Sequence, residues 1–163
     1  EAGYIAYRRA EALLSRIALA RMSRLTADLM ASIDYDVVAR QRRANFVLLD
    51  ERVGAVNRLK PSMDGTRVPM CYPLYVSRGA ELRQFLRKRR VYTAVYWPEV
   101  LMNWDAGAGA KALSRDLVAL PIDQRYGREQ VAIMASLVEE WLSGVSPDAG
   151  EAEQHEPESV QLP

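Results

Sequence analysis

The stretch Val68-Pro-Met-Cys-Tyr-Pro-Leu-Tyr-Val76 decides the fold class of this chain. Every second residue in it is large and apolar, a period of two that indicates a strand with one buried face: Met70, Tyr72, Leu74 and Val76. Pro69 and Pro73 have no backbone N–H to donate to a neighbouring strand. The pattern therefore predicts a strand that lies at the edge of a sheet or contains a bulge.

The sequence on the C-terminal side of this strand alternates between strand and helix patterns. Ser77 is a candidate cap for a short helix, and residues 91–96 are rich in β-branched and aromatic types, which favour a second strand that Pro98 ends. Residues 99–110 contain two glycines and are predicted to form a loop. A third short strand over residues 117–122 and a last helix over residues 127–142 complete the pattern.

The sequence on the N-terminal side predicts three helices, over residues 4–20, from a cap at Ser23, and over residues 36–53. Apolar residues recur in them at spacings of three and four, which predicts one buried stripe on each helix. The stripes consist of Ile5, Leu13, Leu14 and Ile17, then Leu25, Leu29, Met30 and Ile33, then Val37, Val38, Ala44, Leu48 and Leu49.

This order predicts an α+β fold, in which a helical N-terminal entry is followed by a small mixed or antiparallel sheet with helices packed on one face. We expect a helical segment over residues 1–55 and a small α/β domain over residues 56–143. Residues 144–163 are acidic, rich in Gly, Ser, Pro and Gln, and too poor in apolar side chains to form a core, which predicts a disordered tail.

The composition excludes several classes of site. The single histidine, His155, lies in the acidic tail, which argues against Ser-His-Asp catalysis and against a histidine-based zinc site. The single cysteine, Cys71, forms no disulfide within the chain and favours a cytoplasmic protein. No run of about 18 apolar residues is present, so no membrane span is predicted.

Several short strings agree in order and spacing with one protein family. They are Arg42-Arg-Ala-Asn-Phe46, the stretch 69–76 with Glu81-Leu-Arg83 and Val91-Tyr92, then Tyr96-Trp-Pro98, and finally Leu120-Pro-Ile-Asp-Gln-Arg-Tyr126. Together these strings resemble the C-terminal segment of the DegT-like aminotransferases, over roughly residues 20–142, and the last string is the most specific. The resemblance implies the C-terminal domain of a fold-type I enzyme that transfers amino groups, for example onto keto-sugars.

The resemblance also implies partners and a cofactor. In such a family a large N-terminal domain carries pyridoxal phosphate, the protein is a homodimer, and the C-terminal domain closes over a small-molecule substrate. By resemblance, Tyr96, Trp97 and Asn103 would contact the substrate, with Trp104 and Asp105 in the same loop. We therefore expect this chain to be part of a longer parent, without a cofactor or a catalytic residue of its own.

The lysines agree with that expectation. Pyridoxal phosphate chemistry requires a lysine amine in a pocket and an acid on the pyridinium nitrogen. Lys60 precedes a proline in a loop, Lys88 lies in a basic helix end, and Lys111 lies in an Ala- and Gly-rich stretch. None follows the serine-rich sequence that the family places before its lysine, so all three are expected to be surface residues.

Two alternatives remain open. The family usually has an asparagine two residues before the Arg21-Met22 string, and Leu19 stands there instead, which favours a relative that has lost catalysis and only binds or regulates. The basic run from Arg83 to Arg90 suggests a nucleic-acid module, since Arg83, Arg87 and Arg90 share a helical face. No interleaved aromatic residues accompany this run, so we expect no nucleic acid.

Polar residues in two of the strings have a structural explanation. Asp123 is expected to cap the last helix, and Arg125 to tie down the preceding turn. Arg42, Arg43 and Asn45 are expected to form a solvated helix face with one buried ion pair.

Overall fold

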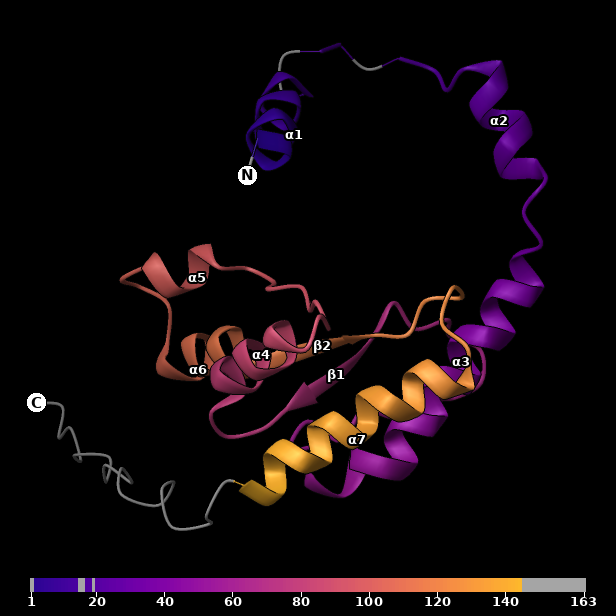
Figure 1. Ribbon diagram of the computed structural model, residues 1–163. Helices are drawn as coiled ribbons and strands as arrows, with labels where there is room; N and C mark the ends of the chain where they lie inside the picture. Colours follow the sequence, from indigo (N-terminus) through magenta and orange to yellow (C-terminus); the bar gives the residue numbers. More distant parts are fainter. Residues whose placement is uncertain (1, 15–16, 19, 145–163) are drawn as a thin grey trace, which may run out of the picture. The chain divides into compact units, whose positions relative to one another are not determined.

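The computed structural model describes residues 2–14, 17–18 and 20–144, which form an α+β architecture (Figure 1). Contacts divide the chain into two units, and the division falls after Asp34. The acidic tail predicted to be disordered lies, from residue 145 onward, outside the described residues. The elements are α1 (Ala2–Leu14), α2 (Arg24–Ala31), α3 (Tyr35–Val53), η1 (Gly54–Val56), β1 (Cys71–Tyr75), α4 (Gly79–Lys88), α5 (Glu99–Met102), α6 (Ala108–Asp116), β2 (Leu117–Pro121) and α7 (Arg128–Gly144).

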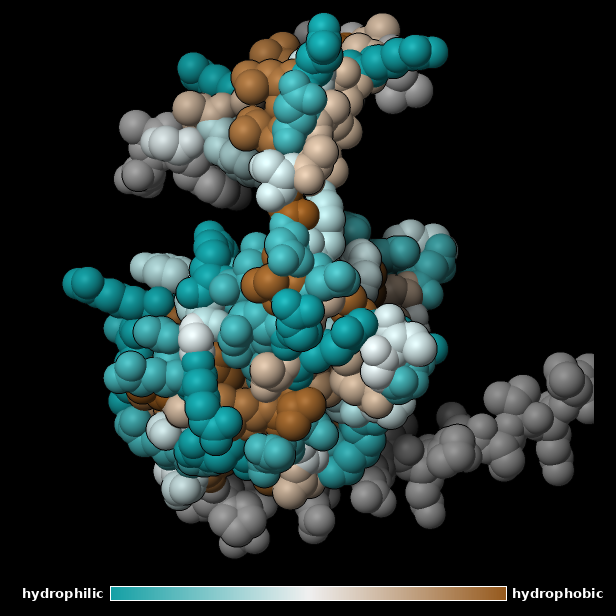
Figure 2. All heavy atoms as spheres, turned by 90° about the vertical axis from the view of Figure 1, so that its right-hand side faces the viewer, coloured by the Kyte–Doolittle hydropathy of each residue, from teal (hydrophilic) through white to brown (hydrophobic). Residues whose placement is uncertain are grey.

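The first unit consists of α1 and α2. The predicted cap is confirmed, because the Thr26 backbone N–H donates to Ser23 Oγ over 3.1 Å. The predicted burial is wrong, since every side chain whose exposure is described in this unit is exposed, including Ile5, Leu25 and Leu29. Figure 2 shows hydrophobic side chains, in brown, open on a helix of this unit. The apolar stripes exist, but the described residues of this unit form no second layer that would cover them.

The second unit is built on two antiparallel strands. The register places Tyr72 opposite Leu120 and Leu74 opposite Val118, and all four side chains are buried on one face of the sheet. Helices α3, α4 and α7 contribute the rest of the core on this face, and α3 and α7 pack side by side (Figure 1). Their buried side chains include Phe46, Leu49, Val53, Leu82, Leu86, Val131, Met134, Ala135 and Val138. Thus α3, which the sequence assigned to a helical entry ending at residue 55, packs with the sheet.

The outer edge of β1 explains how a strand tolerates Pro73. The Asn57 side chain is buried along this edge, where its Nδ2 donates to Pro73 O over 2.9 Å and its Oδ1 accepts from Tyr75 N over 3.0 Å. Arg58 N donates to Tyr75 O over 2.9 Å. The missing N–H of Pro73 therefore faces away from β2 and removes no bond between the strands. The predicted edge position of this strand is confirmed.

Other boundaries differ from the sequence prediction. Residues 91–96 form no strand, and only an isolated antiparallel bridge joins Ala94 to Ala119. Arg90 and Trp97, on either side of this segment, have positive φ angles of 63° and 52°, which interrupt an extended path. The predicted loop over residues 99–110 contains α5 and the start of α6. Helix α4 begins after Arg78 in a left-handed conformation, not at a Ser77 cap.

The Tyr72 hydroxyl group is the polar end of the core. It donates to Asp50 Oδ1 over 2.9 Å and accepts from Asn57 Nδ2 over 3.3 Å, while the Tyr72 ring packs edge-on against Phe46 at 4.9 Å. Burial, and then the hydrogen bond and negative charge of Asp50, raise the pKa of Tyr72 to about 12, although the Asn57 bond opposes them. The folded state therefore favours the neutral phenol.

Tyr72→Phe tests this linkage through its pH dependence. Near pH 8 the free energy of unfolding of the variant should be about 1 kcal/mol lower than that of the wild type, because two hydrogen bonds are lost. A raised pKa in the folded state stabilises the protein below pH 10, and this stabilisation is lost as the pH rises toward 12. The difference in unfolding free energy between the wild type and Tyr72→Phe, measured by denaturant unfolding, should therefore shrink or change sign between about pH 10 and pH 12. A difference that does not change with pH contradicts a raised Tyr72 pKa in the folded protein.

Candidate functional site

Trp97 is the most unusual of the predicted site residues. Its φ angle of 52° lies in the left-handed region, which a bulky side chain rarely adopts, and its side chain is 58% exposed. The neighbouring Tyr96 is half-buried, and the two rings lie 5.6 Å apart at an angle of 46°. The structure thus brings two of the three predicted substrate-contacting residues together, with the indole ring open to the outside.

A buried serine holds this strained backbone. Ser114 Oγ on α6 lies 2.9 Å from Trp97 O and 3.3 Å from Tyr96 O, and it is the donor to both carbonyl groups. The first turn of α5 adds a bond from Val100 N to Trp97 O over 3.0 Å. Sequence reasoning missed Ser114, because a lone serine inside a helix gives no local signal of a bond to residues 17 positions away.

The Tyr96 hydroxyl group forms a hydrogen bond with the Cys71 thiol of β1. Burial raises the pKa of Cys71, and the hydrogen bond from Tyr96 opposes this only in part. Burial and then the neighbouring Cys71 raise the pKa of Tyr96 as well. Both groups are therefore protonated near neutral pH, and Cys71 is not an activated nucleophile, which requires a lowered pKa.

Asn103 does not join the other two predicted residues. Its Oδ1 accepts from Asp105 N over 3.0 Å, an arrangement that closes the turn after α5, and the structure gives no contact between Asn103 and Tyr96 or Trp97. The residues around it are nevertheless notable, because Met102 is 87% exposed and Trp104 is 85% exposed. Residues 97–104 therefore present several large side chains that the described residues leave exposed.

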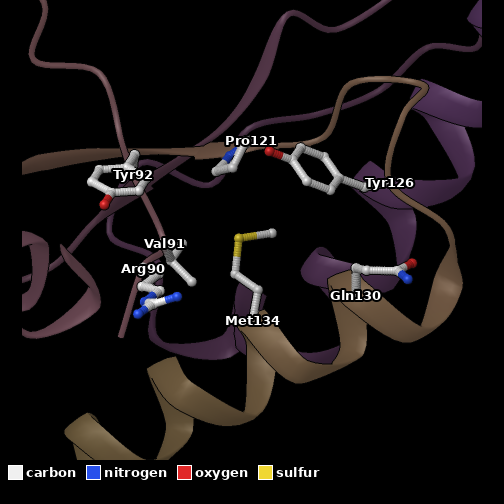
Figure 3. A pocket seen from close by; sticks show the side chains of 7 residues that line it. All are labelled: Arg90, Val91, Tyr92, Pro121, Tyr126, Gln130 and Met134. Carbon is white, nitrogen blue, oxygen red and sulfur yellow. The ribbon is translucent and has the colours of Figure 1, made fainter. Parts of the chain in front are cut away.

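A pocket of about 170 Å³ lies between the C-terminal end of β2 and α7 (Figure 3). In Figure 3 the Met134 side chain rises from α7 toward Pro121, with Tyr92 and Tyr126 on either side. The lining residues are Arg90, Val91, Tyr92, Pro121, Tyr126, Gln130 and Met134. Sequence reasoning did not predict this pocket, because its wall depends on the non-strand path of residues 90–92.

Asn45 joins two of the strings that carry the family resemblance. Its buried Nδ2 donates to Ile122 O, Asp123 O and Tyr126 O over 3.0 to 3.3 Å, and its Oδ1 accepts from Gln41 Nε2 over 2.9 Å. The string over residues 120–126 is therefore held against the string over residues 42–46. The contact fixes the connection between β2 and α7.

The neighbouring arginines of α3 bind loops. Arg42 donates to Gln124 Oε1 and to Pro69 O, each over 3.2 Å, and Arg43 donates to Arg67 O over 3.0 Å. The expected buried ion pair is wrong, because the partners of these guanidinium groups are an amide and backbone carbonyl groups. These carbonyl groups lie in loops whose approach to α3 is not visible in the local sequence.

Asp123 and Arg125 stabilise a turn. Asp123 Oδ1 accepts from Arg125 N over 3.1 Å and from Arg125 Nε over 2.7 Å, and this pair lowers the pKa of Asp123. The first cap of α7 comes from Gln130, whose Oε1 accepts from Gly127 N over 3.0 Å. The expected role of Arg125 is confirmed, whereas Asp123 caps the turn and not the helix.

The lysines offer no cradle for pyridoxal phosphate. Lys60 Nζ donates to Gly54 O over 3.0 Å and to Ala55 O over 2.9 Å, so it satisfies carbonyl groups at the end of α3 and η1. Lys88 is exposed on α4, Lys111 is half-buried on α6, and neither lines the pocket of Figure 3. None of the three lysines therefore lies where it would hold the cofactor in this pocket, and we derive no chemical step through it.

The basic run does not form one face. Arg83 and Arg87 lie on α4, whereas Arg90 follows the helix with a positive φ and lines the pocket of Figure 3. Arg89 lies over the Phe85 ring at 3.5 Å and pairs with Glu140 over 2.7 Å. The expectation that Arg83, Arg87 and Arg90 share a face is wrong, because α4 ends at Lys88.

No family model, curated protein or solved structure matches this chain. Leu19, the departure from the family pattern, lies outside the described residues. Within the described ranges, no helix is both long and apolar enough to cross a membrane. The same ranges contain no cluster of three or more His, Cys, Asp or Glu side chains that suits a metal ion.

Proposed function

We propose that this chain is the small C-terminal domain of a pyridoxal-phosphate-dependent, aminotransferase-like protein. In this proposal the cofactor and its lysine belong to a large domain elsewhere in the parent, which forms a homodimer. The present chain covers a small-molecule substrate, such as a keto-sugar, with Tyr96, Trp97 and the loop that contains Asn103. Its own contribution is to exclude water and to hold the substrate, without a catalytic residue.

The observation that carries the proposal is the conformation of Trp97. A left-handed backbone at a bulky, exposed residue costs about 1 to 3 kcal/mol and persists only where the surroundings fix it. Here the buried Ser114 and the first turn of α5 fix it, and the indole ring contributes nothing to the core. Such strain is typical of residues that contact a ligand.

The full-length parent protein gives the direct test. Purified with pyridoxal phosphate, it should show the absorbance of a cofactor–lysine imine at roughly 410 to 430 nm, and borohydride should abolish it. Under the same conditions the 163-residue chain alone should show no such saturable band. Trp97→Ala in the parent should leave the band unchanged, because Trp97 is assigned to the substrate and not to the cofactor.

The absence of this band in a folded parent with saturating cofactor would contradict the aminotransferase proposal. That result would favour the alternative of a relative that has lost catalysis and binds or regulates, which the leucine at position 19 suggests.

A further inference from the structure

A second concavity, of about 230 Å³, borders α4 on the other side of Tyr92. Two arginines of α4, Arg83 and Arg87, lie four positions apart and therefore on one face of the helix. The segment after the helix forms the opposite wall. The full lining is Ala80, Arg83, Gln84, Arg87, Tyr92, Thr93 and Val95.

Arg83 is a fixed and poorly compensated cation. It is half-buried, and its Nη1 donates to Leu117 O over 2.8 Å, which sets the orientation of the guanidinium group. Burial lowers the pKa of Arg83, and only the charge of Asp116 opposes this. The Asp116 carboxylate is engaged elsewhere, since it accepts from Ala80 N over 3.3 Å and from Arg115 Nε over 3.0 Å. A partly buried cation whose neighbouring carboxylate is already paired with another arginine favours a further anion beside it.

Arg87 is exposed and forms no ion pair with any residue in the described part of the chain. Its five N–H donors are therefore open to a ligand in the same concavity. Gln84 and Thr93 add an amide and a hydroxyl group to the lining. The concavity thus combines two guanidinium groups with neutral donors, and no carboxylate lines it.

We propose that this concavity binds a phosphate monoester. The planar guanidinium group matches the oxygens of a phosphate with two parallel hydrogen bonds, and two such groups suit a dianion. Tyr92 is 71% exposed and borders both this concavity and the pocket of Figure 3, so its ring offers a wall for the group that carries the phosphate. The site uses only residues of this chain, and it is independent of the proposed function.

The arrangement favours a terminal phosphate over a nucleic-acid strand. A strand needs a continuous row of cations along its backbone. Arg89, the next arginine along the chain after Arg87, contacts Phe85 and Glu140, and Arg90 lines the other pocket. Arg83 and Arg87 therefore place two guanidinium groups in one concavity and do not continue into a longer row of cations.

Titration calorimetry on the 163-residue chain at low salt tests the proposal, with inorganic phosphate and phenyl phosphate as the probes. Both should bind saturably, and phenyl phosphate should bind more tightly because its ring reaches Tyr92. Arg87→Gln should weaken both by about tenfold, the effect of losing charged hydrogen bonds. Lys88→Gln is the matched control, since it removes the same charge from an exposed neighbour that does not line the concavity, and it should change the affinity less than twofold.

Three results would overturn the proposal. One is the absence of saturable binding for both probes. Another is an equal loss of affinity in Arg87→Gln and Lys88→Gln, which would indicate general attraction to a basic surface. The last is tighter binding of a single-stranded oligonucleotide without terminal phosphates, which would assign the arginines to a nucleic-acid strand. None of these results bears on the imine band of the parent.

Discussion

Gly79→Ala should destabilise the second unit by at least about 3 kcal/mol, because overpacking against rigid backbone is among the most costly single changes. A Cβ atom at this buried position would lie 1.9 Å from Asp116 O and 2.7 Å from Asp116 C. Both are backbone atoms of the last residue of α6, so α4 would have to move away from the end of α6. That movement would also break the bonds from Ala80 N to Asp116 and from Arg83 to Leu117 O.

Gly109→Ala is the matched control for this prediction. Gly109 lies within α6, and a Cβ atom there would meet nothing within 4 Å. Alanine in a helix is more favourable than glycine by about 0.5 to 1 kcal/mol, so this variant should equal or exceed the wild type in urea unfolding. An insoluble Gly79→Ala with a soluble Gly109→Ala agrees with the prediction. A loss below 1 kcal/mol in Gly79→Ala contradicts it.

The close approach at Gly79 shows why part of the fold could be predicted and part could not. The alternation in residues 70–76 is a local signal, and it correctly predicted that Tyr72, Leu74 and Val76 are buried, whereas Met70, also predicted on the buried face, precedes the strand and is exposed. The strand propensity of residues 91–96 is equally local, but the left-handed residues at both ends of the segment override it. The contact of Gly79 with Asp116 joins positions that are distant in sequence, so no local pattern indicates it.

The buried face of α3 also could not be predicted fully from local sequence. Apolar spacing predicted that Val37 and Ala44 face the core, but both are exposed, and Asn45 and Phe46 are buried. Apolar spacing misplaces the buried face because Asn45 belongs to it. An asparagine is assigned to the surface from sequence unless its hydrogen-bond partners are known. Those partners are carbonyl groups about 80 residues away.

The candidate site, too, could be predicted from the sequence only in part. Tyr96 and Trp97 were suggested by the family resemblance, and in the structure their rings lie 5.6 Å apart. Their support is tertiary, because it comes from Ser114 on α6, a helix that the sequence placed only in part. The arginine concavity likewise depends on Tyr92 and Thr93 leaving the path of a strand.

Asn45→Leu should cost about 3 kcal/mol of unfolding free energy, because it keeps the branched shape of the side chain but removes every hydrogen bond of a buried amide. The carbonyl groups of Ile122 and Asp123 would lose this donor, and Gln41 Nε2 would lose the Asn45 acceptor, whereas Tyr126 O would keep its bond from Gln41 over 3.2 Å. Leaving buried polar groups without partners costs more than a hydrogen bond contributes when it forms.

The loss of stability in Asn45→Leu should also be local, which distinguishes it from a general weakening of the core. Amide hydrogen exchange should accelerate most over residues 122–127, the segment that Asn45 holds, before it does so in β1. The same substitution at an exposed asparagine, Asn103→Leu, removes only one turn-closing bond and should cost less than about 1 kcal/mol. Equal stability of the two variants, or unchanged exchange over residues 122–127, would show that Asn45 does not hold the β2–α7 connection. In that case Asn45 would not join residues 42–46 to residues 120–126.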